Sequence, residues 1–337
     1  MASATHISYL IKDRSYLFLV KREIRKTALE ANFTKTIVGQ LDIIVAEMGS
    51  NLVKHASGGE ILAGIVEDGG ETAFELICID SGPGIRDVKR MMTDGISTTK
   101  TLGQGLGSIQ RLSGKYEIYS QPGWGTIILS RLYKNKIPDK QLASLSIKPL
   151  ILAKVGETFC GDGWYQKTTK GFIKIFIGDG LGHGPQANLA VSEAINAFKL
   201  CPDNSPAENI RFIHHAVKKT RGAVVFIIIY DIKNKEWKIC GVGNISLRIT
   251  GYLVNKGYMC YNGIVGHNIP NTMNDQTLTQ EQVRQFVLWS DGITSRWDLS
   301  KHRMIQKQDI AVQAAAIYKD FARRTDDMSI IIGKQIN

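Results

Sequence analysis

Four acidic segments in the second half of the chain could together form a metal site. Each places an aspartate beside a glycine or a second aspartate, and three of them adjoin strongly apolar runs. The segments are "CGDGW" (Asp162), "IGDGLGHG" (Asp179), "WSDGI" (Asp291) and "TDDMS" (Asp326 and Asp327). A single Asp-Gly pair is most often a turn, but four carboxylates gathered at strand ends would repel one another unless cations were bound. Two divalent cations can share a bridging water and generate hydroxide near neutral pH, so these segments predict hydrolytic chemistry.

The first half carries a different set of chemical groups. Glu47, Asn51 and His55 are spaced i, i+4, i+8 and therefore share one stripe of a helix. A carboxylate and an amide in this arrangement can hold Mg²⁺ or orient a water, although an ordinary solvated stripe has the same pattern. Downstream, Asp80 of "DSGPGI" ends an apolar run, and an aspartate there can accept a hydrogen bond from a base amino group.

Glycines follow at the positions that a nucleotide would require. They are Gly82 and Gly84 of "DSGPGI" and Gly103, Gly105 and Gly107 of "GQGLG". The first pair allows close approach of the backbone, and the second group opens a helix whose free amides suit phosphate. Each glycine pattern alone is weak because turns use the same residues, but together with the acidic helix they predict a nucleotide site.

The elements that must position these groups differ between the two halves. In the first, apolar residues at three- and four-residue steps over 36–56 predict a buried helix face, comprising Leu41, Ile44, Val45, Met48 and Leu52. Strands over 60–68 and 72–80, a short helix after the glycines and two closing strands complete it. In the second half we predict helices over 185–200 and 206–219 and a late helix at 311–323. The accompanying apolar strands suggest an α/β sandwich with a mostly antiparallel sheet.

Length and charge narrow the class of protein. The 337 residues suffice for about two domains, and the polar stretch "KNKIPDKQLAS" is the predicted linker. No apolar run approaches a membrane span and the start lacks a secretory signal, so we expect a soluble, cytoplasmic protein. The net charge is +11, and the Lys and Arg residues of the second half are spread over many segments. This favours a solvated basic surface, which could attract an acidic protein or a phosphorylated substrate, over a nucleic-acid site.

The first region resembles the GHKL ATP-binding fold, in the branch of the anti-sigma-factor and stressosome switch serine/threonine kinases (RsbT/RsbW-like). "EMGSN" matches the N box of that family, "DSGPG" its first glycine box and "GQGLG" its second. The resemblance implies that ATP and Mg²⁺ are the cofactors, that Asn51 chelates Mg²⁺, that Glu47 is the general base and that Asp80 contacts adenine. It further implies that the five glycines line the nucleotide, that "TDGISTTKT" is the lid and that Thr126 supports the base pocket.

The second region resembles the PPM (PP2C-like) serine/threonine phosphatases of the SpoIIE and RsbX type, from the order "GD", "DGLGHG", "GVGN", "SDG" and "DDMS". This implies two Mn²⁺ or Mg²⁺ ions, bridged by Asp179 with help from the Gly180 carbonyl. Asp291 and Asp326 would bind one ion, with Asp327 as an alternative to Asp326, and Asp162 would complete the site. For His183 and Asn244 we favour structural roles, although His183 could be a general acid.

Together the resemblances predict an α+β chain with a GHKL (Bergerat) sandwich at 1–135, a linker at 136–145 and a PP2C-like αββα sandwich at 146–337. The leading functional hypothesis is a bifunctional regulator of partner switching. Kinase and phosphatase activities would both act on a STAS-domain protein, an anti-anti-sigma factor or stressosome component, under reciprocal control through the lid or the junction at 134–150. Two alternatives remain open: a phosphatase regulated by a non-catalytic, ATP-sensing first domain, and an anti-sigma-type protein that sequesters a sigma factor or another regulator. We expect neither nucleic acid nor membrane as a partner, and a homo-oligomer is left open.

Overall fold

The chain divides into two compact units that interleave in sequence. The computed structural model describes residues 4–91, 105–137, 145–251 and 255–336. The N-terminal unit comprises His6–Ala143 and Asp298–Lys319, and the C-terminal unit comprises Met1–Thr5, Ser144–Trp297 and Asp320–Asn337. Within the described ranges, no helix is long and apolar enough to cross a membrane.

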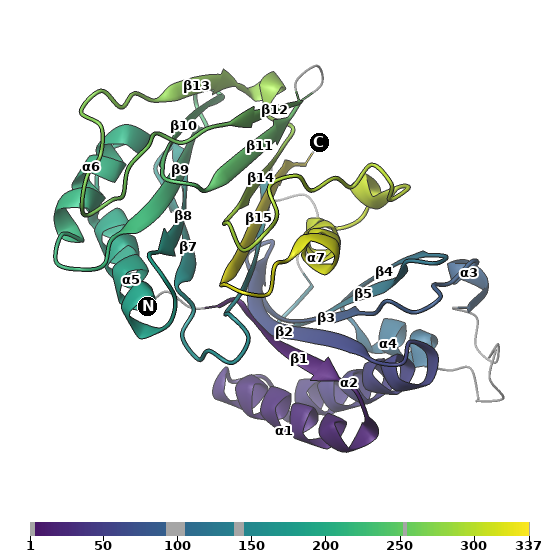
Figure 1. The fold of residues 1–337 in the computed structure, drawn as a ribbon. Helices are drawn as coiled ribbons and strands as arrows, with labels where there is room; N and C mark the ends of the chain where they lie inside the picture. The colour runs from purple at the N-terminus through teal and green to yellow at the C-terminus, as the bar shows by residue number, and fades with distance from the viewer. Residues whose placement is uncertain (1–3, 92–104, 138–144, 252–254, 337) are drawn as a thin grey trace. The chain divides into compact units, whose positions relative to one another are not determined.

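The N-terminal unit is built on one antiparallel sheet in the order β1-β2-β3-β5-β4. The strands are β1 (His6–Ile11), β2 (Gly59–Asp68), β3 (Glu71–Ile79), β4 (Lys115–Gln121) and β5 (Gly125–Tyr133). One face of the sheet is covered by α1 (Arg14–Glu30), α2 (Lys35–His55) and α4 (Gly105–Leu112), with the short α3 (Val88–Met91) in a connection (Figure 1). All five apolar residues of the predicted stripe on α2 are buried, which confirms this helix face.

The opposite face of that sheet carries polar groups that contact a late part of the chain. Strand alternation places Glu60, Glu75 and Arg131 on this face, and they bond to Asp309 or Tyr318 directly or through one another. These contacts belong to the segment with the 3-10 turn η2 (Ile305–Lys307) and α7 (Ile310–Phe321). The predicted 146–337 domain was continuous, whereas residues 298–319 pack with the N-terminal unit because of these polar contacts.

The C-terminal unit contains two antiparallel five-stranded sheets. The first, in the order β13-β10-β9-β8-β7, has β7 (Asp162–Thr169), β8 (Phe172–Gly180), β9 (Ala223–Asp231), β10 (Glu236–Val242) and β13 (Gln276–Thr279). The second, in the order β12-β11-β14-β15-β6, has β6 (Leu145–Leu152), β11 (Ser246–Thr250), β12 (Asn255–Tyr258), β14 (Gln285–Trp289) and β15 (Met328–Gln335). The 3-10 turn η1 (Gln280–Gln282) precedes β14.

Apolar packing explains this double-layered arrangement. Side chains of both sheets, among them Phe226, Trp237, Phe286 and Leu288, form one buried cluster. The helices α5 (Pro185–Leu200) and α6 (Pro206–Ala216) pack on β8, β9 and β10 of the first sheet (Figure 1). The predicted mostly antiparallel sandwich is therefore confirmed. Strands β7, β11, β12 and β13 were not predicted, because they are short or polar and lack a continuous apolar pattern.

Candidate nucleotide and metal sites

Helix α2 and the start of α4 bring the predicted Mg²⁺ and base residues together. Glu47 and Asn51 lie one turn apart on α2, and Gly105 is the first residue of α4. A Cβ atom at Gly105 would lie 2.8 Å from Glu47 Oε2 and 3.6 Å from Asn51 Oδ1. The missing side chain therefore leaves the helix start beside a carboxylate and an amide, where phosphate and a hard cation could be held together.

Asp80 is held at the end of β3 by backbone amides. Its Oδ1 accepts hydrogen bonds from the N–H groups of Gly82 at 2.8 Å and Thr126 at 3.2 Å. Burial raises the pKa of Asp80, and these two amides and the Lys319 ammonium oppose that rise. Thr126 is itself buried, with its hydroxyl 2.9 Å from that of Ser120. One carboxylate oxygen is thus occupied by the protein, which orients the other for a ligand donor.

The surroundings of three glycines of the predicted nucleotide site explain why these positions have no side chain. Gly84 has a φ of 71°, and a Cβ there would lie 2.1 Å from the Gln121 carbonyl oxygen. Gly82 lies against Ala56, at the end of α2, and Gly107 is buried in α4. Gly103 and the predicted lid at 93–101 lie outside the described residues.

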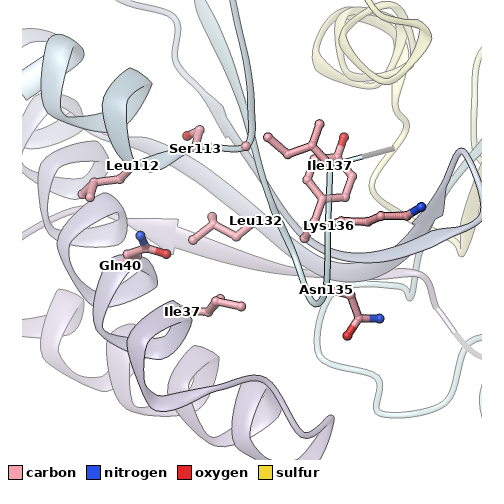
Figure 2. A pocket seen from close by; sticks show the side chains of 10 residues that line it. Ile37, Gln40, Leu112, Ser113, Leu132, Asn135, Lys136 and Ile137 are labelled. Atoms are coloured by element: carbon pink, nitrogen blue, oxygen red, sulfur yellow. The ribbon is translucent and has the colours of Figure 1, made fainter. Parts of the chain in front are cut away.

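A separate hollow of ≈ 240 Å³ lies elsewhere in the N-terminal unit. Figure 2 shows side chains from the start of α2, the end of α4 and the end of β5 around it. The lining residues are Ile37, Gln40, Leu112, Ser113, Gly114, Leu132, Tyr133, Asn135, Lys136 and Ile137. It contains none of the predicted nucleotide residues, so we do not assign it to the nucleotide site.

In the C-terminal unit, neighbouring strands place Asp162 and Asp179 opposite each other. The two residues are paired in the β7–β8 register. Asp162 is 1% exposed, and its Oδ2 accepts hydrogen bonds from the hydroxyls of Ser290 and Ser329, both at 2.7 Å. Its Oδ1 is buried and has no hydrogen-bond partner among the residues that the structure describes. A buried carboxylate oxygen without a partner is unfavourable, and a cation would satisfy it.

The electrostatics of this corner also fit a cation. Burial, partly opposed by the two serine hydroxyls, raises the pKa of Asp162 to about 7, with further increases from Asp327 and Asp291. Burial raises the pKa of Asp179 well above its ordinary value, and Asp162, Asp291, Asp326 and Asp327 raise it further. Among the described residues, no three His, Cys, Asp or Glu side chains converge as a formed metal site requires. The carboxylates are close enough to repel one another, and bound cations would relieve that repulsion.

The two aspartates of "TDDMS" differ in what they contact. Asp327 is buried, and its Oδ1 and Oδ2 accept hydrogen bonds from the Lys154 and Gly161 amides, each at 2.8 Å. Asp326 is partly exposed, and its Oδ1 accepts from the Asp327 amide at 2.9 Å. The backbone contacts of Asp327 stabilise the loop around Gly161, and they favour Asp326 as the metal ligand of the pair.

Around these carboxylates, the remaining predicted residues have distinct surroundings. Asp291 is exposed and its Oδ2 accepts a hydrogen bond from Asn244 Nδ2 at 3.0 Å. A Cβ at Gly180 would lie 2.4 Å from the Ala187 carbonyl oxygen, so α5 packs directly on this end of β8. His183 is exposed and its Nδ1 lies 2.9 Å from Glu157 Oε1, which supports a structural role for this histidine.

Three side chains at the candidate metal site were missed or undervalued in the sequence. Ser290 and Ser329 position Asp162, and Asn244 positions Asp291. The signal was present, because Ser290 precedes Asp291 in "WSDGI", Ser329 belongs to "DDMS" and Asn244 ends "GVGN". The tertiary contacts alone show which carboxylate each of them reaches.

The two units define a class of protein with a GHKL ATPase region and a PP2C-like phosphatase fold. A family model for the histidine kinase-like ATPase domain matches residues 13–131. Serine/threonine-protein kinase RsbT of Bacillus subtilis (strain 168) is 34% identical over 104 residues, which cover 31% of this chain and 78% of RsbT. Through its N-terminal region, the chain belongs to the RsbT family of histidine kinase-like ATPase domains.

The remainder is similar to phosphatases. Phosphoserine phosphatase RsbX of Bacillus subtilis (strain 168) is 26% identical over 200 residues, 54% of this chain and 91% of RsbX. A crystal structure of RsbX with magnesium matches at 20% identity and a TM-score of 0.50, over 57% of this chain and 96% of that one. A structure from work on the bacterial stressosome as a modular system that controls secondary messenger signalling matches at 26% identity and a TM-score of 0.51, over 57% and 100%. Both predicted folds are therefore confirmed.

Proposed function

We propose that this chain is a bifunctional switch that phosphorylates and dephosphorylates serine or threonine on a STAS-domain partner. The observation that carries the proposal is the presence of two separate sets of candidate chemical groups in one chain. Glu47, Asn51 and Gly105 meet at one site, and Asp162 presents a buried, unpartnered oxygen at the other. The similarity to a serine/threonine kinase in one half and to a phosphoserine phosphatase in the other supports it.

In the kinase direction, the substrate hydroxyl oxygen forms a bond to the γ-phosphorus of ATP and the bond to ADP breaks. Glu47 would accept the hydroxyl proton, while Asn51 would hold Mg²⁺ and the start of α4 at Gly105 would bind phosphate. Asp80 would accept from the adenine amino group. The position of Gly105 beside Glu47 and Asn51 supports these assignments.

In the phosphatase direction, a water oxygen bonds to phosphorus and the serine or threonine oxygen leaves. Two Mn²⁺ or Mg²⁺ ions would be held by Asp162, Asp179, Gly180, Asp291 and Asp326. When bound, these ions would supply an activated water near neutral pH. The raised pKa of Asp179, caused by burial and then by its acidic neighbours, supports this role. Both activities running together on one partner would only hydrolyse ATP, so the proposal requires control.

The test uses the complete chain, radiolabelled ATP and the STAS protein encoded beside it or recovered with it. Asp179→Asn/Asp291→Asn should lose phosphate release from the phosphorylated partner and accumulate label on it. Glu47→Gln in that background should abolish label transfer. Phosphate release by the double variant at the wild-type rate would refute the phosphatase assignment. No label transfer by the double variant would leave an ATP-sensing first domain, and nucleotide-independent capture of a regulator without either reaction would favour a sequestering protein.

A further inference from the structure

One segment belongs to the C-terminal half in sequence and to the N-terminal unit in its contacts. Residues Asp298–Lys319, here called the bridging segment, lie between the predicted metal ligands Asp291 and Asp326. The residues directly before and directly after the bridging segment belong to the C-terminal unit. Any displacement of the bridging segment is therefore transmitted through covalent bonds toward both metal-binding motifs.

A buried ion network anchors the middle of the bridging segment. Asp309 Oδ2 and Oδ1 accept from Arg131 Nη1 at 3.0 Å and Nη2 at 3.2 Å, and Asp309 also pairs with Lys115. The Arg131 side chain is fully buried and bonds in addition to Asp68 and Glu75. A charge network of this burial is hard to dissolve, because each broken pair leaves a buried charge. The segment is thus held firmly on the sheet.

The end of the bridging segment contacts the turn between β4 and β5. Lys319 Nζ donates to the Trp124 carbonyl at 3.0 Å and lies 4.4 Å from the centre of that indole ring. The His302 ring contacts the same indole ring in a tilted arrangement, with the ring centres 4.7 Å apart. Side chains near both ends of the bridging segment, 17 positions apart in sequence, therefore contact this one turn.

The same turn forms one wall of the candidate nucleotide site. Trp124 is followed by Gly125 and Thr126, whose amide binds Asp80. Gly123 donates to the Pro83 carbonyl at 2.9 Å, between the two glycines of the first glycine box. A ligand that orders Asp80 and its glycine loop would consequently order the Trp124 backbone, whose carbonyl accepts the hydrogen bond from Lys319.

Beyond Lys319, the chain is hydrogen-bonded to the Asp291 motif within the C-terminal unit. The Arg323 amide donates to the Gly292 carbonyl at 2.8 Å, and the Thr294 amide donates to the Phe321 carbonyl at 3.0 Å. Gly292 directly follows Asp291, and Asp326 lies three residues beyond Arg323. These two backbone bonds connect the exit of the segment to the Asp291 motif, and Asp326 follows the exit along the chain.

We infer that nucleotide binding at Asp80 is coupled to the metal-binding motifs through the bridging segment. The contact of Lys319 with Trp124 couples this segment to the turn between β4 and β5. This inference rests on the proposed function and names its control element. It places control at 298–319, in addition to the lid and the 134–150 junction. By linkage, the effect is reciprocal, so metal binding also changes nucleotide affinity.

Hydrogen exchange of the complete chain with and without ADP, at constant Mg²⁺, tests the inference without using either activity. In the wild-type chain, ADP should slow exchange about 5-fold or more in three regions: the turn at 119–126, the bridging segment and residues 320–329. In Lys319→Ala, ADP should still slow exchange in the turn at 119–126, but not in the bridging segment or in residues 320–329. Lys307→Ala removes an exposed lysine from the same segment and should behave as wild type. Lys319→Arg keeps a cationic donor and should restore the wild-type pattern.

The outcomes separate this inference from the proposed function. If ADP protects 119–126 but not 320–329 in the wild-type chain, the inference fails while both activities can still be measured. If Lys319→Ala transmits protection as the wild-type chain does, the inference also fails. An absence of ADP binding would overturn both, because the nucleotide site itself would be refuted.

Discussion

Removal of the Asp309 carboxylate should destabilise the N-terminal unit far more than loss of an ordinary helix cap. The side chain is 6% exposed and bonds to the fully buried Arg131. Its Oδ1 also accepts from the Ala311 amide at 2.8 Å at the start of α7. Asp309→Ala therefore removes one partner of a buried pair and a helix cap together.

The magnitude follows from these two losses. Breaking a buried ion pair costs about 3–5 kcal/mol, and the lower end applies because Arg131 keeps Glu75 and Asp68. Loss of the cap adds about 1 kcal/mol, so we expect a decrease of about 4 kcal/mol in the free energy of unfolding. Asp13→Ala is the matched control, because Asp13 caps α1 in the same unit, is exposed and, within the described part of the chain, accepts only the bond from the Tyr16 amide. It should cost about 1 kcal/mol.

The assay is urea unfolding of the complete chain at pH 7, followed by tryptophan fluorescence and by circular dichroism. The transition of the N-terminal unit is the one that ADP raises, since a ligand stabilises the unit that binds it. Burial by itself would raise the pKa of Asp309, but Arg131 and Lys115 outweigh it and hold that pKa well below its ordinary value. The contribution is thus complete above about pH 4 and is lost only as the pH falls through the lowered value. Equal shifts for Asp309→Ala and Asp13→Ala would refute the reasoning.

Three further predictions concern the two sites. Glu47→Gln should lower phosphotransfer by about 10²–10⁴-fold with ADP affinity preserved; an equal loss of ADP affinity would contradict a role as base. Gly84→Ala should weaken ADP binding more than tenfold, because its Cβ would clash with the Gln121 carbonyl, whereas Gly70→Ala, with a φ of 84° and open space, should not. Because the folded-state pKa of Asp162 is raised to about 7, the metal-free chain should lose stability as the pH rises from about 4 to 7. Asp162→Asn should flatten that dependence in thermal melts, and an unchanged slope would contradict it.

Local patterns were sufficient to predict much of the fold and to select the candidate site residues. The periodic apolar stripe on α2 determines a buried helix face wherever the helix packs, and α5 begins at Pro185 as the glycine-rich corner before it predicts. Aspartates at the ends of apolar strands likewise indicate a site, because the sheet gathers strand ends. The strands β1, β7, β11, β12 and β13 were not predicted in this way, since pairing with neighbouring strands rather than a long apolar run of their own makes them strands.

The sequence by itself therefore determined the candidate chemical groups, because these depend on residue type and short-range spacing, and the two fold classes, because its motifs resemble those of known families. Only the tertiary structure decided which atoms meet: the serines that hold Asp162, the backbone amides that occupy Asp327, and the unpartnered Asp162 oxygen. It also decided that Asp298–Lys319 packs with the N-terminal unit. The physical reason is that Asp309 and Arg131 are 178 positions apart, and nothing in local spacing shows that a buried arginine needs that particular carboxylate.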